Sequence, residues 1–384
     1  MRFDFAAPTR IIFGSGVSRQ IPDIAKEFGR RAFVVTGANP QRLEALLREF
    51  EQTGVQTTIC SAAGEPTVSG VRASTQIAKE HASDVVIGIG GGSAIDHAKA
   101  VAILATNSCD PLDYLEVIGK GKPFEHTPLP SIAVPTTAGT GAEVTRNAVL
   151  GSPEHNMKAS LRSPMMLAKV ALIDPGLTLA VPPEITAFTG LDTLTQLLEP
   201  FVSCRANPFV DVLCKEGMQR VRDSLLAAFT NGEDRSARES MSLASLLSGL
   251  ALSNAGLGVV HGFASPLGGM LAAPHGSLCA AILPYGTVAN IRALRSREPS
   301  HPSLTKYAET ARILTGQPEA KSEDLGPWLL GFCKRLGTRT LGELGLRPEQ
   351  IPLLVEKAAS ASSMKANPLP LTPDELTDIA ERAL

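Results

Sequence analysis

Strand-like and helix-like segments alternate through the first half of this 384-residue chain. Short runs rich in valine and isoleucine predict strands at 31–37, 55–60, 84–90, 130–137 and 168–174. Between the first four lie segments with apolar residues at helical spacing, at 41–54, 70–83 and 92–107. Strands that alternate with helices and are apolar on both faces form a mostly parallel sheet covered by helices. This half is therefore predicted to have an α/β fold.

The pattern changes after Pro182 and Pro183. The segments 184–203, 208–230 and 237–256 are long and helix-periodic, and no convincing strand follows them. Proline fits the first position of a helix, so the proline pair predicts a helix start at a domain boundary. The chain length suits two domains. We predict an α/β domain over 1–181 and an all-helical domain over 182–384.

Composition and charge narrow the class of partner. A net charge of −2 and an isoelectric point near 6.4 argue against a nucleic-acid surface, which needs clustered lysine and arginine. No long uncharged apolar run predicts a membrane span, and the first residues lack the pattern of a secretion signal. We expect a cytoplasmic protein that binds a small molecule and no membrane. The six cysteines lack CxxC spacing, which predicts reduced thiols.

A glycine-rich turn follows the predicted strand 84–90. The order of strand, glycine turn and helix is what a phosphate site needs, since Gly91 and Gly92 let the backbone approach an anion closely. Ser93 is expected to cap the helix that follows. The turn departs from the GxGxxG pattern because serine occupies the third glycine position. A tight turn that only packs strand against helix is the alternative.

A second polar turn follows the predicted strand 130–137. Thr136, Thr137, Thr140 and Thr145 could donate hydrogen bonds to a nucleotide or cap the local backbone. Alone this segment is uninformative. With the glycine turn, it places two polar loops at the carboxyl ends of strands, where open α/β sheets bind nucleotides.

Four residues of the second half form a candidate metal site. Asp192 and Gln196 are four residues apart on a predicted helix, so both project from one face. His261 and His275 flank a segment that contains Pro266 and other turn residues. One carboxylate and two imidazoles suit iron(II) or zinc(II), with the Gln196 amide oxygen as a weak fourth ligand. Structural hydrogen bonding is the alternative for each residue.

Four ordered motifs carry a resemblance to a known family. GGGSAIDHAKA, VPTTAGTGAEVT, TGLDTLTQLLEP and HGFASPLGGMLAAPHG, in this order, resemble the iron-containing (group III) alcohol dehydrogenase family over nearly the whole chain. The resemblance implies an N-terminal nucleotide-binding α/β domain, a C-terminal helical domain that holds metal and substrate, and an active site in the cleft between them. It also implies NAD or NADP as the cofactor and a divalent metal, iron or zinc. We further expect a homodimer.

The resemblance assigns roles to residues of both domains. Gly91, Gly92 and Ser93 match the positions that bind the cofactor pyrophosphate. Asp192, His261 and His275 fall on three of the four metal-ligand positions of the family, and they are also the expected catalytic residues. The other matched positions are Asp96 and Lys99 of the GGGSxxDxAK pattern, Thr136, Thr137 and Thr140 near the adenine and ribose, and Gln196 on the fourth ligand position.

The sequence departs from the family pattern at three positions. Gln196 stands where the family normally has histidine, and an amide binds first-row metals far less well than an imidazole. Ser265 stands where alcohol-active members carry a histidine thought to assist proton transfer. Gly37 stands where many NAD-preferring members have an aspartate that repels a 2′-phosphate, so NADP is not excluded.

These features predict an NAD(P)-dependent oxidoreductase that interconverts a small alcohol or hydroxy acid with its carbonyl compound. A bound metal would polarise the oxygen during hydride transfer. Without it, His261 or His275 must supply the proton. The alternatives are a metal-independent enzyme like the maleylacetate reductases of the same superfamily, a relative of dehydroquinate synthase and glycerol-1-phosphate dehydrogenase, and a non-catalytic nucleotide-binding protein.

Overall fold

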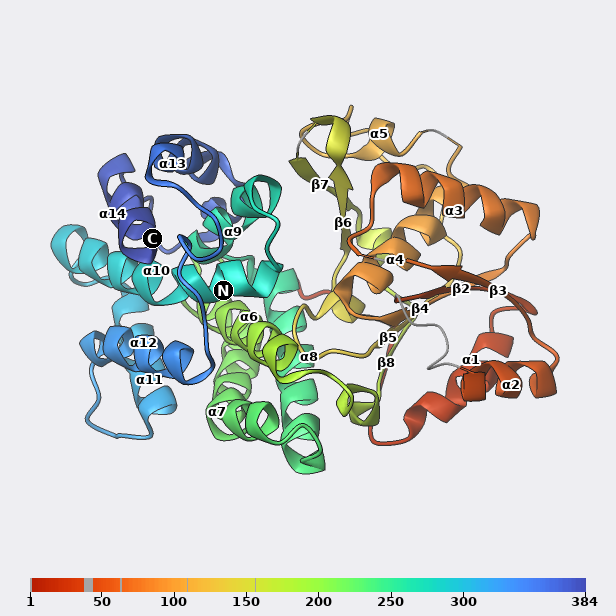
Figure 1. The fold of residues 1–384 in the computed structure, drawn as a ribbon, viewed down its shortest axis with the longest axis horizontal. Coiled ribbons are helices and arrows are strands. Elements are labelled where there is room, and N and C mark those ends of the chain that lie inside the picture. Colours follow the sequence, from red (N-terminus) through yellow and green to blue (C-terminus); the bar gives the residue numbers. More distant parts are fainter. Residues whose placement is uncertain (1, 38–43, 63, 109, 156) are drawn as a thin grey trace. The chain divides into compact units, whose positions relative to one another are not determined.

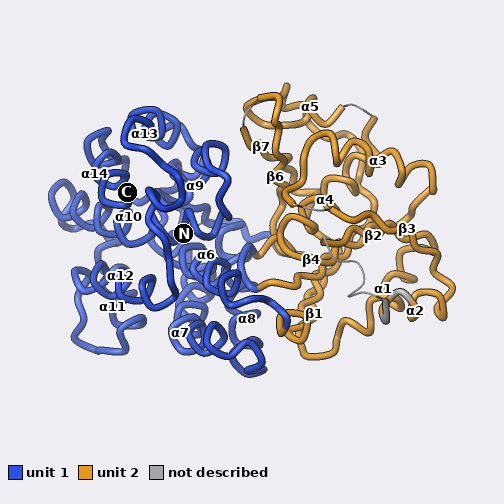
Figure 2. Tube along the Cα trace, in the orientation of Figure 1, with its two compact units in different colours: residues 1–6, 138–140, 180–384 blue, residues 7–137, 141–179 orange. Residues whose placement is uncertain are grey.

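The computed structural model describes residues 2–37, 44–62, 64–108, 110–155 and 157–384. The chain forms two compact units, which are coloured separately in Figure 2. The α/β unit comprises Ala7–Thr137 and Gly141–Leu179. The helical unit comprises Ala180–Leu384 together with the residues up to Ala6 and the short segment Ala138–Thr140. The N-terminal residues and one loop therefore belong with the helices and not with the sheet.

A six-stranded parallel sheet forms the centre of the α/β unit (Figure 1). Its strands are β1 (Arg10–Phe13), β2 (Arg31–Thr36), β3 (Gln56–Ser61), β4 (Val85–Gly90), β5 (Ser131–Pro135) and β8 (Val170–Ile173), in the order β1-β8-β5-β4-β2-β3. The helices of this unit are α1 (Ile21–Lys26), α2 (Glu44–Thr53), α3 (Val68–Glu80), α4 (Gly92–Thr106) and α5 (Pro111–Tyr114). In Figure 1, α3 and α4 lie over one face of the sheet and α1 and α2 over the other. The predicted α/β fold is confirmed.

Strand β4 shows how the sequence sets the two faces. Val85, Ile87 and Ile89 belong to the apolar cluster that includes α1 and α2, whereas Val86 packs with α4. The alternate positions next to Val86 are glycines, because α4 lies very close to them. A Cβ on Gly88 would come within 2.8 Å of the Ala98 side chain, so a larger residue there would push the helix away.

The strand order reverses between β2 and β4. The chain runs from β2 to β3 toward one edge of the sheet and from β4 to β5 toward the other. Open α/β sheets bind ligands outside the carboxyl ends of the strands at such a point. Gly37 follows β2 there, and a Cβ on Gly90 would lie 3.3 Å from the Gly37 nitrogen, so the two turns adjoin.

The predicted strands correspond to β2, β3, β4, β5 and β8. The sequence analysis missed β1 and the antiparallel hairpin of β6 (Asn147–Ser152) and β7 (Met157–Arg162). Each of these two omissions has a physical reason. Strand β1 has only four residues, and the hairpin carries polar residues on its exposed face, which gives little apolar signal. Part of the predicted helix 41–54 and the Cys109 thiol lie outside the described residues.

No strand occurs in the second half, which is described throughout from Pro182 to the C-terminus. Its helices are α6 (Pro183–Val202), α7 (Pro208–Thr230), α8 (Arg235–Ala255), α9 (Val259–Met270), α10 (His275–Arg297), α11 (Pro302–Thr315), α12 (Leu325–Arg335), α13 (Ile351–Ser360) and α14 (Pro373–Ala383). As predicted, α6 begins at the proline pair, with Pro182 as its N-cap.

Helix α6 is the central helix of this unit. It packs against α7, α8 and α10, and it is buried on nearly all sides. Gly190 and Gly217 allow the close approach of α6 and α7, since a Cβ on either would lie within 2.5 Å of a leucine side chain. Within the described residues, no single helix is long and apolar enough to cross a membrane; only α8 and α9 taken together, bent by 98°, meet that length and composition.

Candidate metal centre

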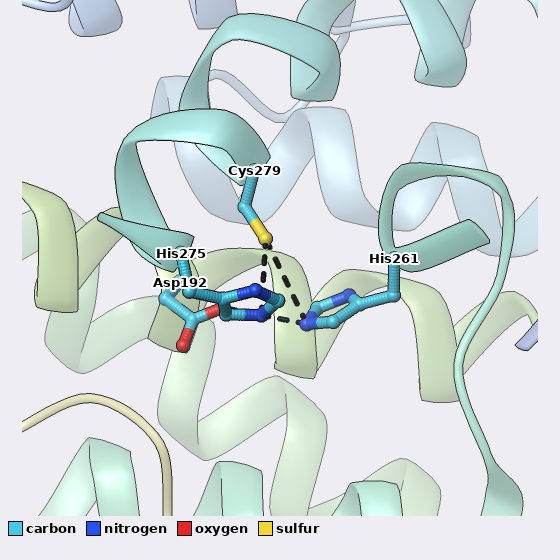
Figure 3. Close-up of side chains that lie close together, drawn as sticks. All are labelled: Asp192, His261, His275 and Cys279. Carbon is cyan, nitrogen blue, oxygen red and sulfur yellow. Dashed lines mark hydrogen bonds and ion pairs between the residues drawn. The ribbon is translucent and has the colours of Figure 1, made fainter. Parts of the chain in front are cut away.

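Three helices of the helical unit bring the candidate ligands together. Asp192 comes from the middle of α6, His261 from the first turn of α9 and His275 from the first position of α10. Figure 3 shows the two imidazoles and the carboxylate turned toward a common point, where the thiol of Cys279 joins them. The four donor atoms all lie within 4.8 Å of one another. The structure thus brings together three of the four predicted ligands.

The distances define a compact group. The Nε2 atom of His261 lies 3.3 Å from Asp192 Oδ1, and Nε2 of His275 lies 3.9 Å from the same oxygen. The Cys279 sulfur lies 3.9 Å from Nε2 of His261 and 3.6 Å from Nε2 of His275. Asp192, His261 and Cys279 are buried, whereas the His275 side chain is 39% exposed. His275 therefore forms the accessible side of the group.

Asp192 carries the observation that fits a cation. Its Oδ2 accepts a hydrogen bond from Gln196 at 2.9 Å, but its buried Oδ1 has no hydrogen-bond partner. A buried carboxylate oxygen without a partner is costly unless a cation completes it. Oxygen, imidazole nitrogen and thiolate sulfur are together a donor set for zinc or another late first-row divalent metal. The residues therefore fit a divalent metal.

His261 is oriented by a carboxylate behind it. Its Nδ1 lies 2.7 Å from Oε2 of Glu199, which directs the Nδ1–H to Glu199 and leaves Nε2 facing the group. The other Glu199 oxygen accepts the Val260 N–H at 2.6 Å, at the start of α9. Gly258 makes room for this, since a Cβ there would lie 3.1 Å from the Glu199 carboxylate. Glu199 thus fixes both the helix start and the ring.

The electrostatics favour positive charge at the centre of the group. Burial alone would raise the pKa of Asp192, yet the neighbouring imidazoles outweigh burial and hold that pKa below its usual range. Burial alone would lower the pKa of His261, but the surrounding sulfur and carboxylates raise it well above its usual range. The Cys279 sulfur likewise raises the pKa of His275. A divalent cation can replace the protons that these charges attract.

Gln196 lies beside Asp192, and its amide is hydrogen-bonded to protein groups. Its amide nitrogen donates to Asp192 Oδ2, and its Oε1 accepts the Ser248 hydroxyl at 3.0 Å. The orientation is chemically determined, because a carboxylate oxygen accepts hydrogen bonds and so requires the NH2 end. Both ends of the amide are therefore engaged with protein groups. In this arrangement Gln196 positions Asp192, and metal ligation by Gln196 stays a prediction.

The glycine turn of the α/β unit has the form of an anion site. Gly91 is the N-cap of α4, and Gly92 begins the helix. The first backbone N–H groups of a helix have no partners within it and favour an anion. Ser93 lies inside the helix, so the prediction that it caps α4 is wrong; the cap residue is Gly91, which has no side chain. Pyrophosphate binding by these three residues stays a prediction.

Asp96 and Lys99 form an internal tie in the α/β unit. The Lys99 ammonium is 2.8 Å from the Thr145 hydroxyl and 2.9 Å from the Ala142 carbonyl, and it also contacts the Asn147 carbonyl. Asp96 pairs with Lys99 at 3.0 Å and accepts the N–H of Val149. These contacts hold α4 to β6 and to the loop before it. A direct cofactor contact from either residue stays a prediction.

The other predicted cofactor residues lie on two loops. The Thr136 N–H donates to the Gly90 carbonyl at 2.9 Å, and Thr137 lies 3.6 Å from where a Cβ on Gly91 would be, so the threonine loop adjoins the glycine turn. Gly37 follows β2 and accepts hydroxyl hydrogen bonds from Thr36 and Ser61 through its carbonyl. Thr140 lies in the segment that belongs to the helical unit.

Sequence reasoning missed two residues of the metal centre. Glu199 is seven residues after Asp192 on α6, hence on the same helical face. Cys279 is four residues after His275 on α10, again on the same face. The helical spacing was a usable signal in both cases. A single cysteine lies outside the CxxC pattern, and a glutamate in a helix is usually exposed, so neither residue type by itself indicates a metal centre.

The chain has a glycine turn at the point where the strand order of a parallel sheet reverses. Its helical unit contains a buried set of metal-binding donor atoms. Together these features are typical of one class of protein, the nucleotide-dependent dehydrogenases with a metal site. Sequence models of two families match the chain: iron-containing alcohol dehydrogenase over residues 8–175, and the C-terminal part of the Fe-containing alcohol dehydrogenase family over residues 186–384. The chain belongs to the iron-containing alcohol dehydrogenase family.

Individual relatives match this chain over nearly its whole length. Alcohol dehydrogenase 4 of Saccharomyces cerevisiae is 32% identical over 99% of this chain and 98% of its own. Long-chain-alcohol dehydrogenase 1 of Geobacillus thermodenitrificans is 34% identical over 94% of this chain and 92% of its own. The crystal structure of sulfoacetaldehyde reductase from Bifidobacterium kashiwanohense with NAD+ is 31% identical, has a TM-score of 0.88, and covers 99% of this chain and 98% of that one.

Family membership fixes the general activity. The protein is an enzyme, an alcohol dehydrogenase in the broad sense, and its family implies NAD(H), a divalent metal and a small alcohol or aldehyde as substrate. The sequence-based prediction of an alcohol and carbonyl oxidoreductase is confirmed. The three alternatives, maleylacetate reductase, the dehydroquinate synthase group and a non-catalytic protein, are not favoured, since the relatives are alcohol dehydrogenases.

Proposed function

We propose that the protein interconverts a small primary or secondary alcohol, or a hydroxy acid, with its aldehyde or ketone, and that it does so with a metal held by the Asp192 group. The observation that carries this proposal is the buried Asp192 Oδ1, which has no hydrogen-bond partner and faces two imidazoles at 3.3 and 3.9 Å. When bound there, a divalent metal acts as a Lewis acid on the substrate oxygen and stabilises the charge that develops during hydride transfer.

The chain's own residues prepare the site for this chemistry. Glu199 holds Nδ1–H of His261, so Nε2 is the ring nitrogen that would face a cation. Gln196 fixes Asp192 through Oδ2 and leaves Oδ1 for the cation. His275 is the member of the group with an exposed edge. We propose that the substrate approaches the group on the side of His275, and that a proton exchanges with water on the same side.

We further propose that the enzyme accepts NADP(H) as well as NAD(H). The support is Gly37, which has no carboxylate to repel a 2′-phosphate, in a turn that adjoins the glycine turn of β4. The sulfoacetaldehyde reductase from Bifidobacterium kashiwanohense was crystallised with NAD+. A homodimeric and cytoplasmic protein remains our expectation from family resemblance. The predicted division at residues 181 and 182 likewise stays a proposal.

The proposal is tested by steady-state kinetics of the zinc-loaded and iron-loaded enzyme with alcohols, aldehydes and hydroxy acids, in the presence of each nicotinamide cofactor. We expect turnover with at least one alcohol and aldehyde pair. Gly37→Asp should lower kcat/KM for NADP(H) by about tenfold or more relative to NAD(H), since an unfavourable charge contact costs at least about 1.4 kcal/mol. Absence of turnover with every substrate and both metals contradicts the proposal.

A further inference from the structure

We propose that Cys279 is the fourth metal ligand of this protein, in place of the histidine that the family carries at position 196, and that the resulting site prefers zinc to iron. The inference deepens the proposed function, since it concerns the metal of the same site. It rests on the position of the sulfur, on the engagement of Gln196 and on the chemistry of the four donors.

The positions of the donor atoms suit a single ion. Metal–nitrogen bonds of about 2.0 Å and metal–sulfur bonds of about 2.3 Å give a tetrahedron with edges of roughly 3.3 to 3.6 Å. The observed separations are 3.3 and 3.9 Å from Asp192 Oδ1 to the two imidazoles, and 3.6 and 3.9 Å from the Cys279 sulfur to the same nitrogens. These four separations equal the edges or exceed them by up to about 0.6 Å, so a small contraction of the group would give a coordination shell.

The environment of Cys279 differs from that of the other buried thiols. The Cys333 sulfur faces the Ala280 carbonyl, and burial raises the pKa of that thiol to about 12. Burial also raises the pKa of Cys214. The Cys279 sulfur instead lies 3.9 Å from Nε2 of His261 and 3.6 Å from Nε2 of His275. Its place on α10, one turn after His275, sets both side chains on one face of the helix.

Gln196 does not compete for this role. The amide is 4% exposed, its nitrogen is bound to Asp192, and its oxygen is bound to Ser248. Rotation of the oxygen toward the imidazoles would remove the hydrogen bond that the amide nitrogen donates to Asp192 Oδ2. Asp192 would then have two buried oxygens to satisfy instead of one.

The donor set predicts the metal. One carboxylate and one thiolate together neutralise a divalent ion, whereas a site with one carboxylate and three imidazoles keeps a net positive charge. A thiolate is also a soft ligand that selects zinc over harder metals, while iron(II) sites favour nitrogen and oxygen donors. The replacement of an imidazole by a thiolate therefore shifts the preference toward zinc.

Cobalt(II) tests the ligand directly. Reduced protein stripped by a chelator and loaded with one equivalent of Co²⁺ should show a sulfur-to-cobalt charge-transfer band in the near ultraviolet. Cys279→Ser should bind cobalt without this band. Cys333→Ala, a buried thiol outside the site, and Cys204→Ser, an exposed one, should keep it. A band that persists in Cys279→Ser, or cobalt binding to the unaltered protein without a band, overturns the proposal.

X-ray absorption at the zinc edge provides a test that needs no variant. The unaltered protein should show one sulfur at about 2.3 Å among nitrogen and oxygen ligands. A shell of nitrogen and oxygen alone overturns the proposal. In competition between Zn²⁺ and Fe²⁺ under anaerobic conditions, Cys279→Ser should lose about tenfold or more of the preference for zinc, and an unchanged preference overturns the selectivity part.

A rescue variant tests position 196. In the Cys279→Ser background, Gln196→His restores the family's donor set, so cobalt affinity should recover by about tenfold or more without the sulfur band. Absence of recovery in a protein with unchanged circular dichroism contradicts the proposed geometry. None of these measurements uses a substrate. An inactive enzyme with an intact sulfur band would therefore disprove the proposed function and leave the ligand assignment standing.

Discussion

Two buried clusters of ionisable side chains, one in each unit, show opposite uses of buried charge. In the α/β unit, the Lys99 ammonium has Asp96, the Thr145 hydroxyl and backbone carbonyls as partners. In the helical unit, Asp192 has one oxygen bound to Gln196 and one without a hydrogen-bond partner. Both clusters arise from conspicuous sequence motifs. The difference lies in whether the protein completes the cluster by itself.

A structural cluster differs from a functional one in whether the protein supplies all the partners of the buried charges. A satisfied buried ion pair fixes the positions of its elements, here α4 and β6, and removal of one partner is costly. An incomplete cluster gains from an outside cation, so its chemistry depends on what binds. We therefore expect changes in the first cluster to affect stability and changes in the second to affect metal binding and turnover.

The largest expected effect comes from Asp192→Asn. The variant keeps the size of the side chain but removes the charge that holds the cation. Since a Lewis-acid metal supplies several kcal/mol of transition-state stabilisation, kcat/KM should fall on the order of a thousandfold, with loss of bound metal. NADH binding, measured by fluorescence, should persist, because the glycine turn is unchanged. Full activity and full metal content in this variant would contradict the functional role of the Asp192 cluster.

Lys99→Met should affect stability instead. It leaves Asp96 and several carbonyls without their cation, and the loss of one partner of a buried pair costs about 3 to 5 kcal/mol. Urea denaturation measures the change. Asp96→Asn is the matched control, since the Asp96 side chain is 15% exposed and its loss should cost less. Metal content per folded molecule should stay the same, and a parallel loss of metal would contradict the separation of the two clusters.

Glu143 adds a pH dependence to the first cluster. Burial raises its pKa from 4.5 to about 7, while its own backbone and Lys99 act in the opposite direction. The folded pKa exceeds the unfolded one, so the folded state binds more protons between these values. Stability from this group is therefore complete below about pH 4.5, falls up to about pH 7 and stays lower above it.

Glu143→Gln cannot ionise and should escape this loss. The expected gain in unfolding free energy over the unaltered protein is about 3 kcal/mol at pH 8 and less than about 1 kcal/mol at pH 5. Denaturation at the two pH values measures the difference. An equal effect at both values would show that Glu143 does not titrate in this range.

The sequence predicts the fold better than it predicts the roles of polar residues. The strands β2, β4 and β5 are apolar on both faces, so their pattern is distinct. The hairpin β6–β7 escaped prediction because its exposed side faces neither α4 nor the core. Spacing also predicted that Asp192 and Gln196 share a helical face, which the structure shows.

The composition of the metal group required three-dimensional information. Spacing places Cys279 on the face of His275, and Glu199 on that of Asp192, but says nothing about the crossing of α6, α9 and α10. Only that crossing shows that Glu199 faces His261 and that the Cys279 sulfur lies beside two imidazoles. The internal contacts of Lys99 could not be foreseen for the same reason, since a basic residue near a phosphate motif and one bound to internal carbonyls look identical in sequence.

Glu199→Gln is a mild change that tests the structural and the metal-related role of one carboxylate separately. Its carboxylate holds the start of α9 through Val260 and orients His261 through Nδ1. Glutamine can accept from the Val260 N–H, but its NH2 group cannot accept from Nδ1. The His261 proton then moves to Nε2, where a metal would bind. Since such orienting partners are worth about 10- to 100-fold, zinc affinity and kcat/KM should fall by that factor.

Asn367→Ala is the control that separates the two uses. Asn367 accepts the Val259 N–H at the same helix start and does not touch His261. Its loss should cost about 1 to 3 kcal/mol of stability, because it also leaves the buried Asn290 without two hydrogen bonds, and it should leave zinc affinity within about threefold. If both variants lower zinc affinity equally, the effect comes from the helix start. If only Glu199→Gln lowers zinc affinity, the carboxylate acts on the His261 imidazole. The metal group then depends on the charge of a residue that orients one of its ligands.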